Sequence, residues 1–314
     1  MLRAGCQVRL RVRGRVSRSI RLVAVLLPCA LLLVAGCSSA GGSSDSAPGR
    51  PAAPSSPAPT SPGPGSGPGV APGATSGPPG ARGRWQPAPG TTWQWQLTGT
   101  LDTGVDAEVY DVDGFTTSAA QVAALHAEGR KVVCYISVGA YEDFRPDRQL
   151  FPAVLLGKSD GWPGERWLDI RRLDLLEPII AARFAMCRSK GFDAVEPDNV
   201  DGYSNDTGFP LTFADQLAFN RMVAGLAHRL GLAVALKNDL DQVPQLVGDF
   251  DFAVDEQCAE YQECDELLPF TAAGKAVLEA EYNLPRSAFC GAARRLRFSA
   301  MLKRLSLDAW RQAC

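Results

Sequence analysis

Two groups of carboxylates follow short apolar runs in this chain, and they are the residues best suited to carry out chemistry. Glu196, Asp198 and Asp201 follow the run Phe-Asp-Ala-Val. Asp255 and Glu256 follow the run Phe-Asp-Phe-Ala-Val. Charged groups at the mouth of a buried strand resist burial unless they are paired or used. Carboxylates at two strand ends therefore indicate a hydrolase that works with a pair of acids.

Asp198 and Glu256 suit the two roles that glycoside hydrolysis requires. One carboxyl protonates the leaving oxygen, and the other, ionised, attacks the sugar or activates water. We assign Asp198 as the nucleophile or charge stabiliser and Glu256 as the proton donor and later base. Glu196 and Asp255 precede them and are expected either to point away from the cavity or to contact Lys237. A solvated loop cap is the alternative for any single acid.

Further polar and aromatic residues near the predicted strand ends are expected to bind substrate. Their hydroxyl, amide and ammonium groups can hydrogen-bond sugar hydroxyls, and tyrosine rings can stack on pyranose faces. Ordinary barrel packing is the alternative for the tyrosines, and a helix-start cap is the alternative for the asparagine. The candidates are Tyr135, Ser137, Asp201, Tyr203, Lys237, Asn238 and Tyr282.

Strand-like and helix-like segments alternate along the chain, which is typical of parallel βαβ units. Eight such strands close naturally into a single α/β domain, a (β/α)8 TIM-type barrel, whose catalytic groups lie at the carboxyl ends of the strands. The acids fall at such ends. An open doubly wound sheet is the alternative, but the sequence has no Gly-rich phosphate loop to support it. The predicted strands are 92–97, 108–112, 131–138, 167–170, 192–195, 232–236, 250–254 and 276–280.

Residues 1–37 are typical of a lipoprotein-type signal peptide. Seven arginines precede an apolar core, and Val-Ala-Gly-Cys ends the segment at Cys37. We predict that Cys37 is lipidated and anchors the protein to the cell membrane; an ordinary secretion signal is the alternative. Residues 38–84 are rich in Ser, Pro and Gly and are predicted to be a disordered linker. Residues 85–314 then form the catalytic domain, which is expected outside the cytoplasm.

The charge and the histidines of the chain narrow its partners. Without the seven arginines of the leader, the net charge falls from −2 to about −9, which argues against a nucleic-acid partner. His126 and His228 do not stand at ligand spacing to a cysteine pair, so we expect neither a metal nor another cofactor. We expect a monomer that binds a polysaccharide.

Six cysteines fall in the predicted domain, and an even number in an exported protein indicates disulfides. About fifteen pairings are possible in principle. We favour Cys258–Cys264 as a local bond and Cys290–Cys314 as a bond that holds the C-terminus. These leave Cys134–Cys187.

Five stretches of the chain, in this order, resemble glycoside hydrolase family 114. The resemblance implies a barrel fold and endo-acting cleavage of α-1,4-linked galactosamine polymers, and it favours retention at the anomeric carbon. The family's catalytic Asp and Glu fall on Asp198 and Glu256. A carbohydrate-binding lipoprotein with the same barrel but no turnover is the alternative function. The stretches are Trp-Gln-Trp-Gln-Leu at 93–97, Lys-Val-Val-Cys-Tyr-Ile-Ser-Val-Gly at 131–139, Glu-Pro-Asp-Asn-Val-Asp-Gly-Tyr at 196–203, Leu-Lys-Asn-Asp at 236–239 and Val-Asp-Glu-Gln-Cys at 254–258.

Overall fold

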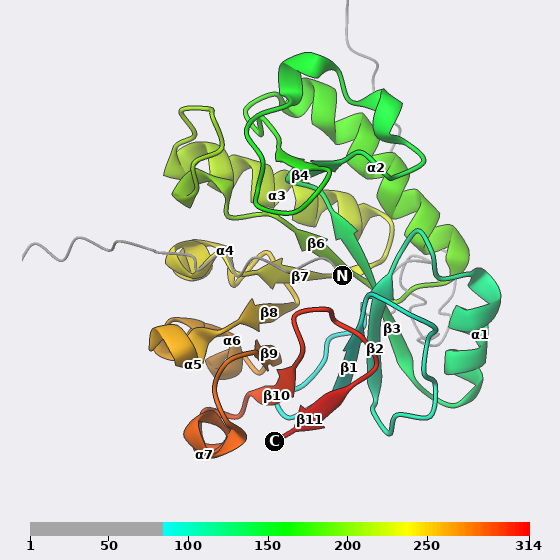
Figure 1. Ribbon diagram of the computed structural model, residues 1–314, viewed down its shortest axis with the longest axis vertical. Helices are drawn as coiled ribbons and strands as arrows, with labels where there is room; N and C mark the ends of the chain where they lie inside the picture. The colour runs from blue at the N-terminus through cyan, green and yellow to red at the C-terminus, as the bar shows by residue number, and fades with distance from the viewer. Residues whose placement is uncertain (1–83) are drawn as a thin grey trace, which may run out of the picture. The chain divides into compact units, whose positions relative to one another are not determined.

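The computed structural model describes residues 84–314, whose fold is built on a nine-stranded sheet that curls into a barrel (Figure 1). The sheet order is β1-β2-β3-β6-β7-β8-β9-β10-β11. Each neighbouring pair from β1 to β10 is parallel, and β11 pairs antiparallel with β10. The strands are β1 Trp93–Gln96, β2 Val109–Asp113, β3 Lys131–Ser137, β6 Ala194–Asp198, β7 Ala233–Lys237, β8 Phe252–Glu256, β9 Val277–Glu281, β10 Ser299–Lys303 and β11 Arg311–Ala313.

The predicted α/β barrel is confirmed, but one of its eight predicted strands was wrong. The segment predicted at 167–170 contributes β5 (Glu165–Trp167), which pairs antiparallel with β4 (Ala140–Glu142) in a separate two-stranded sheet. The eighth parallel strand is instead β10, which the sequence analysis missed. Its run Ser-Ala-Met-Leu-Lys follows an arginine-rich helix closely in the sequence and has only a weak apolar pattern of its own. Pairing with β9 makes it a strand.

Helices lie around the outside of the barrel (Figure 1). Ser118 and Thr212 begin two of them with capping boxes, in which each side chain accepts a hydrogen bond from the backbone N–H three residues on. The α-helices are α1 Ala119–Ala127, α2 Leu173–Lys190, α3 Phe213–Arg229, α4 Val243–Leu246, α5 Cys258–Tyr261, α6 Leu268–Ala272 and α7 Arg286–Leu296. The 3-10 turns are η1 Arg148–Leu150, η2 Ala153–Leu155, η3 Gly202–Ser204, η4 Leu240–Gln242 and η5 Cys264–Leu267.

Two hydrophobic cores lie on the two faces of the sheet. The inner core fills the barrel with small and large side chains that include Trp93, Trp95, Ala194, Ala235 and Val254. The larger outer core packs the sheet against the helices. Because side chains alternate between the two faces of a strand, residues two apart share a face. The last residues of β6, β7 and β8 therefore point inward, like the alanines and valine that precede them.

The free edges of the sheet meet through hydrogen bonds from side chains. The indole Nε1 of Trp93 on β1 donates to the carbonyl of Ser299 on β10 over 2.7 Å. Arg311 on β11 donates from Nη1 to the carbonyl of Trp93 over 2.6 Å. These bonds hold β1 beside the last two strands, so that the barrel closes around its inner core.

All three predicted disulfides are confirmed. Cys134 on β3 bonds Cys187 on α2, Cys258 bonds Cys264, and Cys290 on α7 bonds Cys314. Their Cα–Cα distances of 6.1, 4.7 and 5.2 Å lie within the range that disulfides span.

The predictions for the N-terminal part of the chain concern residues that the structure does not describe. The predicted signal peptide, Cys37 and the predicted linker up to residue 83 lie outside the described residues. Among residues 84–314, no helix is both long and apolar enough to cross a membrane.

Candidate active site

Asp198 is the last residue of β6, and three donors hold its carboxylate. The hydroxyl of Tyr135 donates to Oδ2 over 2.8 Å, and the backbone N–H of Asn199 donates to Oδ1 over 2.8 Å. The ammonium of Lys237 lies 3.1 Å from Oδ1. The side chain keeps 20% of its surface exposed, so the carboxylate is oriented and still reachable.

Glu256 is the last residue of β8, and it is held in the same manner. The hydroxyl of Tyr282 donates to Oε1 over 2.5 Å, and the amide of Asn238 donates to Oε2 over 2.8 Å. Lys237 Nζ lies 3.2 Å from Oε2. The Asn238 side chain also accepts from the Glu256 backbone N–H over 2.9 Å, so it fixes both ends of the residue. With 24% of its surface exposed, the side chain of Glu256 is as accessible as that of Asp198.

The strand between them sets the separation of the two carboxylates. β7 lies between β6 and β8 in the sheet, and it carries Lys237 at its end. Because Lys237 Nζ is 3.1 Å from Asp198 Oδ1 and 3.2 Å from Glu256 Oε2, these two oxygens are at most about 6.3 Å apart. Carboxyl groups in retaining glycosidases lie about 5–5.5 Å apart and in inverting ones about 6.5–9.5 Å. Two carboxylates within this limit are close enough together to flank one glycosidic bond.

A left-handed residue follows each of these three strands. Asn199, Asn238 and Gln257 have φ values of 62°, 53° and 68°. Such values are uncommon outside glycine, and asparagine tolerates them best. The turn carries the backbone away directly after the functional side chain, which leaves that side chain at the rim of the barrel.

Gly139 is required where the loop after β3 crosses the end of β6. A Cβ at this position would lie 1.7 Å from the carbonyl oxygen of Asn199, so any side chain would displace one of the two segments. Backbone N–H groups of Val138 and Gly139 donate to the carbonyl of Asp198 over 3.1 and 3.2 Å. The close approach therefore fixes the backbone of the candidate nucleophile.

The two tyrosines at the site act as hydrogen-bond donors. Burial, followed by the charge of Asp198, raises the pKa of Tyr135 well above its usual value. Burial, followed by the charge of Glu256, does the same to the pKa of Tyr282. Both hydroxyls are thus protonated at neutral pH and donate to the carboxylates.

The predicted site residues do not all gather on the acid pair. Tyr135, Asn238 and Tyr282 contact Asp198 or Glu256 directly, as described above. Ser137 is buried and donates to Asn199 Oδ1 over 2.8 Å, so it supports the turn after β6. Lys237 was expected to hydrogen-bond sugar, but its ammonium contacts carboxylates instead.

Asp201 and Tyr203 lie in the loop after β6. The Asp201 side chain is buried and accepts from the amide of Asn205 over 3.3 Å. The Tyr203 hydroxyl donates to Asp241 over 3.1 Å, and its ring packs edge-on against Phe213. The structure therefore gives both residues partners within the loops around the site.

The side chains of Glu196 and Asp255, the acids that precede Asp198 and Glu256, point to different faces of the sheet. Glu196 points inward, two residues before Asp198, and its Oε1 lies 3.4 Å from Lys237 Nζ. Asp255 lies on the other face of β8, and burial, followed by the charge of Glu279, raises its pKa well above the usual range. Glu196 therefore contacts Lys237, and Asp255 points away from the cavity, so each acid follows one of the two expected alternatives.

Sequence reasoning missed Asp111, Asp160 and Glu165. Asp111 on β2 is buried inside the barrel, and burial raises its pKa to about 7. Burial, followed by the charge of Asp160, raises the pKa of Glu165 to about 8, and the charge of Asp198 contributes further. Asp160 and Glu165 flank the half-exposed Trp162 on the hairpin between β4 and β5. Nothing in their local sequence indicates the pairing, because it depends on where the hairpin folds.

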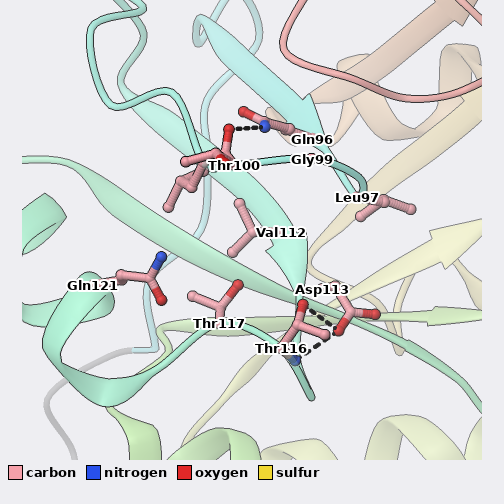
Figure 2. Close-up of a pocket in the computed structure, with 10 residues that line it drawn as sticks. Gln96, Leu97, Gly99, Thr100, Val112, Asp113, Thr116, Thr117 and Gln121 are labelled. Carbon is pink, nitrogen blue, oxygen red and sulfur yellow. Dashed lines mark hydrogen bonds between the residues drawn. The ribbon is translucent and has the colours of Figure 1, made fainter.

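A pocket lies between the ends of β1 and β2 and the start of α1, and Gln96, Val112, Asp113, Thr117 and Gln121 are among the residues that line it (Figure 2). Its single carboxylate, from Asp113, accepts from the backbone N–H and hydroxyl of Thr116 and pairs with Arg145 over 2.7 Å. These contacts occupy the Asp113 carboxylate, and the lining of this pocket has no second acid to pair with it.

One group of residues in the described part of the chain has donor atoms near enough together for a metal. It consists of Cys258, Cys264 and Glu279. The two sulfurs are joined to each other in a disulfide, so they are not thiolates that could bind an ion.

Comparison with known proteins shows what this chain is similar to. Residues 74–314 match glycoside hydrolase family GH114. The solved structures include that of Ega3 from Aspergillus fumigatus in complex with galactosamine. Its sequence is 40% identical to this chain, and the two structures superpose with a TM-score of 0.70 over 76% of this chain and 100% of that chain. The glycoside hydrolase domain of PelA from Pseudomonas aeruginosa shares the fold, with 14% identity and a TM-score of 0.57 over 71% of this chain and 98% of that chain.

An uncharacterized protein of Deinococcus radiodurans is 31% identical over 149 residues, which are 42% of this chain. The chain spans about half the length of that relative, 47%.

Proposed function

Because the chain belongs to glycoside hydrolase family 114, we propose that it is an endo-acting glycoside hydrolase of α-1,4-linked, galactosamine-rich polysaccharide. The observation that carries the proposal is the convergence of Asp198 and Glu256 on one lysine, Lys237, from strands two apart in the barrel. The relative crystallised with galactosamine supports the sugar class.

In the proposed reaction, Glu256 protonates the glycosidic oxygen while the Asp198 carboxylate attacks the anomeric carbon. The bond to the leaving sugar breaks, and a glycosyl ester on Asp198 forms. Glu256, now ionised, takes a proton from water, and the hydroxide oxygen attacks the anomeric carbon and releases Asp198. The upper limit of about 6.3 Å between Asp198 Oδ1 and Glu256 Oε2 agrees with the separation of about 5–5.5 Å in retaining enzymes, so we propose this course.

The charge around the site supports a cationic sugar. Unacetylated galactosamine carries an ammonium group, and carboxylates attract it. Asp160 and Glu165 on the β4–β5 hairpin lie near enough to Asp198 to interact with its charge. With a pKa raised to about 8 by burial, Glu165 is mostly protonated at neutral pH and can donate a hydrogen bond to a sugar hydroxyl. Trp162 between them has 51% of its surface exposed and offers a ring on which a pyranose can stack. We infer that this hairpin contacts the chain of the polymer.

The N-terminal pattern supports a place outside the cytoplasm. A lipid on Cys37 would tether the enzyme to the cell membrane, and residues 38–84 would let the domain reach its substrate. The three disulfides agree with an oxidising compartment.

Amide variants of the two acids test the assignment. D198N and E256Q keep shape but remove the carboxylate, and each is expected to lower kcat by several orders of magnitude on α-1,4-galactosamine polymer, measured as new reducing ends. D249N removes an exposed acid that pairs with Arg221 and serves as the matched control. Near-normal turnover by both site variants would refute the assignment. If wild-type protein binds the polymer but releases no reducing ends, the chain is instead a carbohydrate-binding lipoprotein.

A further inference from the structure

Three carboxyl groups and one aromatic ring surround the ammonium of Lys237. Its Nζ lies 3.1 Å from Asp198, 3.2 Å from Glu256 and 3.4 Å from Glu196. It also lies 4.9 Å from the centre of the Trp95 ring. Nζ donates a hydrogen bond to Asp198, and its contacts with Glu256 and Glu196 are ion pairs. With 2% of its side chain exposed, Lys237 has little surface to offer a sugar.

The negative charges around this ammonium outnumber it. Four carboxyl groups, those of Asp111, Glu196, Asp198 and Glu256, face the inside of the barrel near it. Burial raises the pKa of Asp111 to about 7 and, with the charge of Asp111, that of Glu196 well above the usual range. Glu196 is therefore protonated at neutral pH, and the nearest partners of the ammonium are the carboxyl groups of Asp198 and Glu256.

The same surroundings change the pKa of Lys237. Burial alone would lower the pKa of its ammonium, but the charges of Asp198, Glu256 and Glu196 together raise it well above the usual value. Lys237 is thus a permanent cation across the range in which glycosidases work. A fixed positive charge within about 4–6 Å favours the ionised form of a carboxyl group.

We propose that Lys237 is a positioning residue: its ammonium holds the carboxyl groups of Asp198 and Glu256 at reacting distance and supplies the positive charge that compensates Asp198 when it acts as the nucleophile. Lys237 acts through these acids and does not touch the substrate. The charged and aromatic groups near it are Trp95 on β1, Asp111 on β2, Glu196 and Asp198 on β6 and Glu256 on β8. Tyr135 on β3 and Tyr282 on β9 contact these acids from the other side. The roles of Asp198 and Glu256 rest on the proposed function, but the charge balance does not.

The test replaces Lys237 by methionine, which keeps most of the length of the unbranched side chain and removes the charge. K237M is expected to lower kcat by about 100-fold or more with little change in KM, because the partner carboxylates are left uncompensated. The acid limb of its pH–activity profile is expected to move up by about one pH unit or more. K303M is the matched control, because Lys303 is a second buried lysine at the end of a barrel strand and donates to the backbone carbonyl of Asp308.

A structural role alone would lower activity without moving the acid limb, and an unchanged limb in active K237M would overturn the proposal. Infrared spectroscopy of the carboxyl groups adds a measurement that needs no activity. At pH 7, K237M is expected to hold one more protonated carboxyl than wild type, and K303M the same number. Equal numbers in all three proteins would also overturn it. K237Q, which keeps polarity without charge, replaces K237M if methionine prevents folding.

These readouts separate the two proposals. Wild-type protein that gives no reducing ends contradicts the proposed function, while the infrared count still decides the role of Lys237. Active wild type with an unshifted K237M profile and an unchanged carboxyl count contradicts only the role of Lys237.

Discussion

Removal of one hydroxyl, in Y282F, tests whether the hydrogen bonds around the acids support catalysis. The Tyr282 hydroxyl donates to Glu256 Oε1 over 2.5 Å, and the phenylalanine ring fills the same space without this donor. A hydrogen bond to a charged group contributes about 1.5–3 kcal/mol. If the bond orients Glu256 in the transition state, its loss lowers kcat/KM by about 10- to 150-fold, since about 1.36 kcal/mol corresponds to a factor of ten.

The assay is the release of reducing ends from α-1,4-galactosamine polymer, with the melting temperature recorded for each variant. Y110F is the matched control: the buried Tyr110 on β2 donates its hydroxyl to the carbonyl of Val105 over 2.6 Å, on the outer face of the sheet. It is expected to lose some stability and keep its kcat. Y135F, which removes the donor to Asp198, is expected to behave like Y282F.

An Y282F protein that folds normally and stays within about twofold of wild-type kcat/KM would refute this reasoning. The hydrogen bond would then contribute equally to the resting enzyme and to the transition state.

Three further predictions concern the frame of the site and the anchor. G139A is expected to lose at least about 1–3 kcal/mol of stability through the clash with Asn199, while G248A, whose Cβ would meet nothing within 4 Å, stays within about 0.5 kcal/mol in urea unfolding. Burial, followed by Glu281, raises the pKa of Glu279 to about 8, so the folded protein keeps a proton that the unfolded chain loses above about 4.5, and stability falls as the pH rises between these values. E279Q removes this term, so its melting temperature should gain more over wild type at pH 8 than at pH 5; an equal gain would contradict it. C37A is expected to release the protein from membranes into the medium, seen by fractionation, and retention there would contradict the lipid anchor.

Local sequence was sufficient for much of the frame. Seven barrel strands and the position of Asp198 and Glu256 at strand ends follow from apolar runs and from the alternation of parallel βα units. The even number of cysteines predicted disulfides, and the favoured pairing among about fifteen is the one observed. β10 did not follow, because its run Ser-Ala-Met-Leu-Lys is only weakly apolar. The β4–β5 hairpin did not follow, because its two strands have three residues each and pair across a long loop.

Lys237 shows most clearly what the sequence determined and what only the tertiary structure decided. Its place at the end of an apolar run showed that it would stand on the same rim as the acids. Its contacts depended on β7 lying between β6 and β8, which is a property of the sheet order and not of any local pattern. Alternation put Glu196 and Asp198 on one face, but only the neighbouring strands decided that this face meets one buried ammonium. Chemistry at this site depends on which charges become neighbours after the chain has folded, because electrostatic interaction falls with distance in space rather than along the sequence.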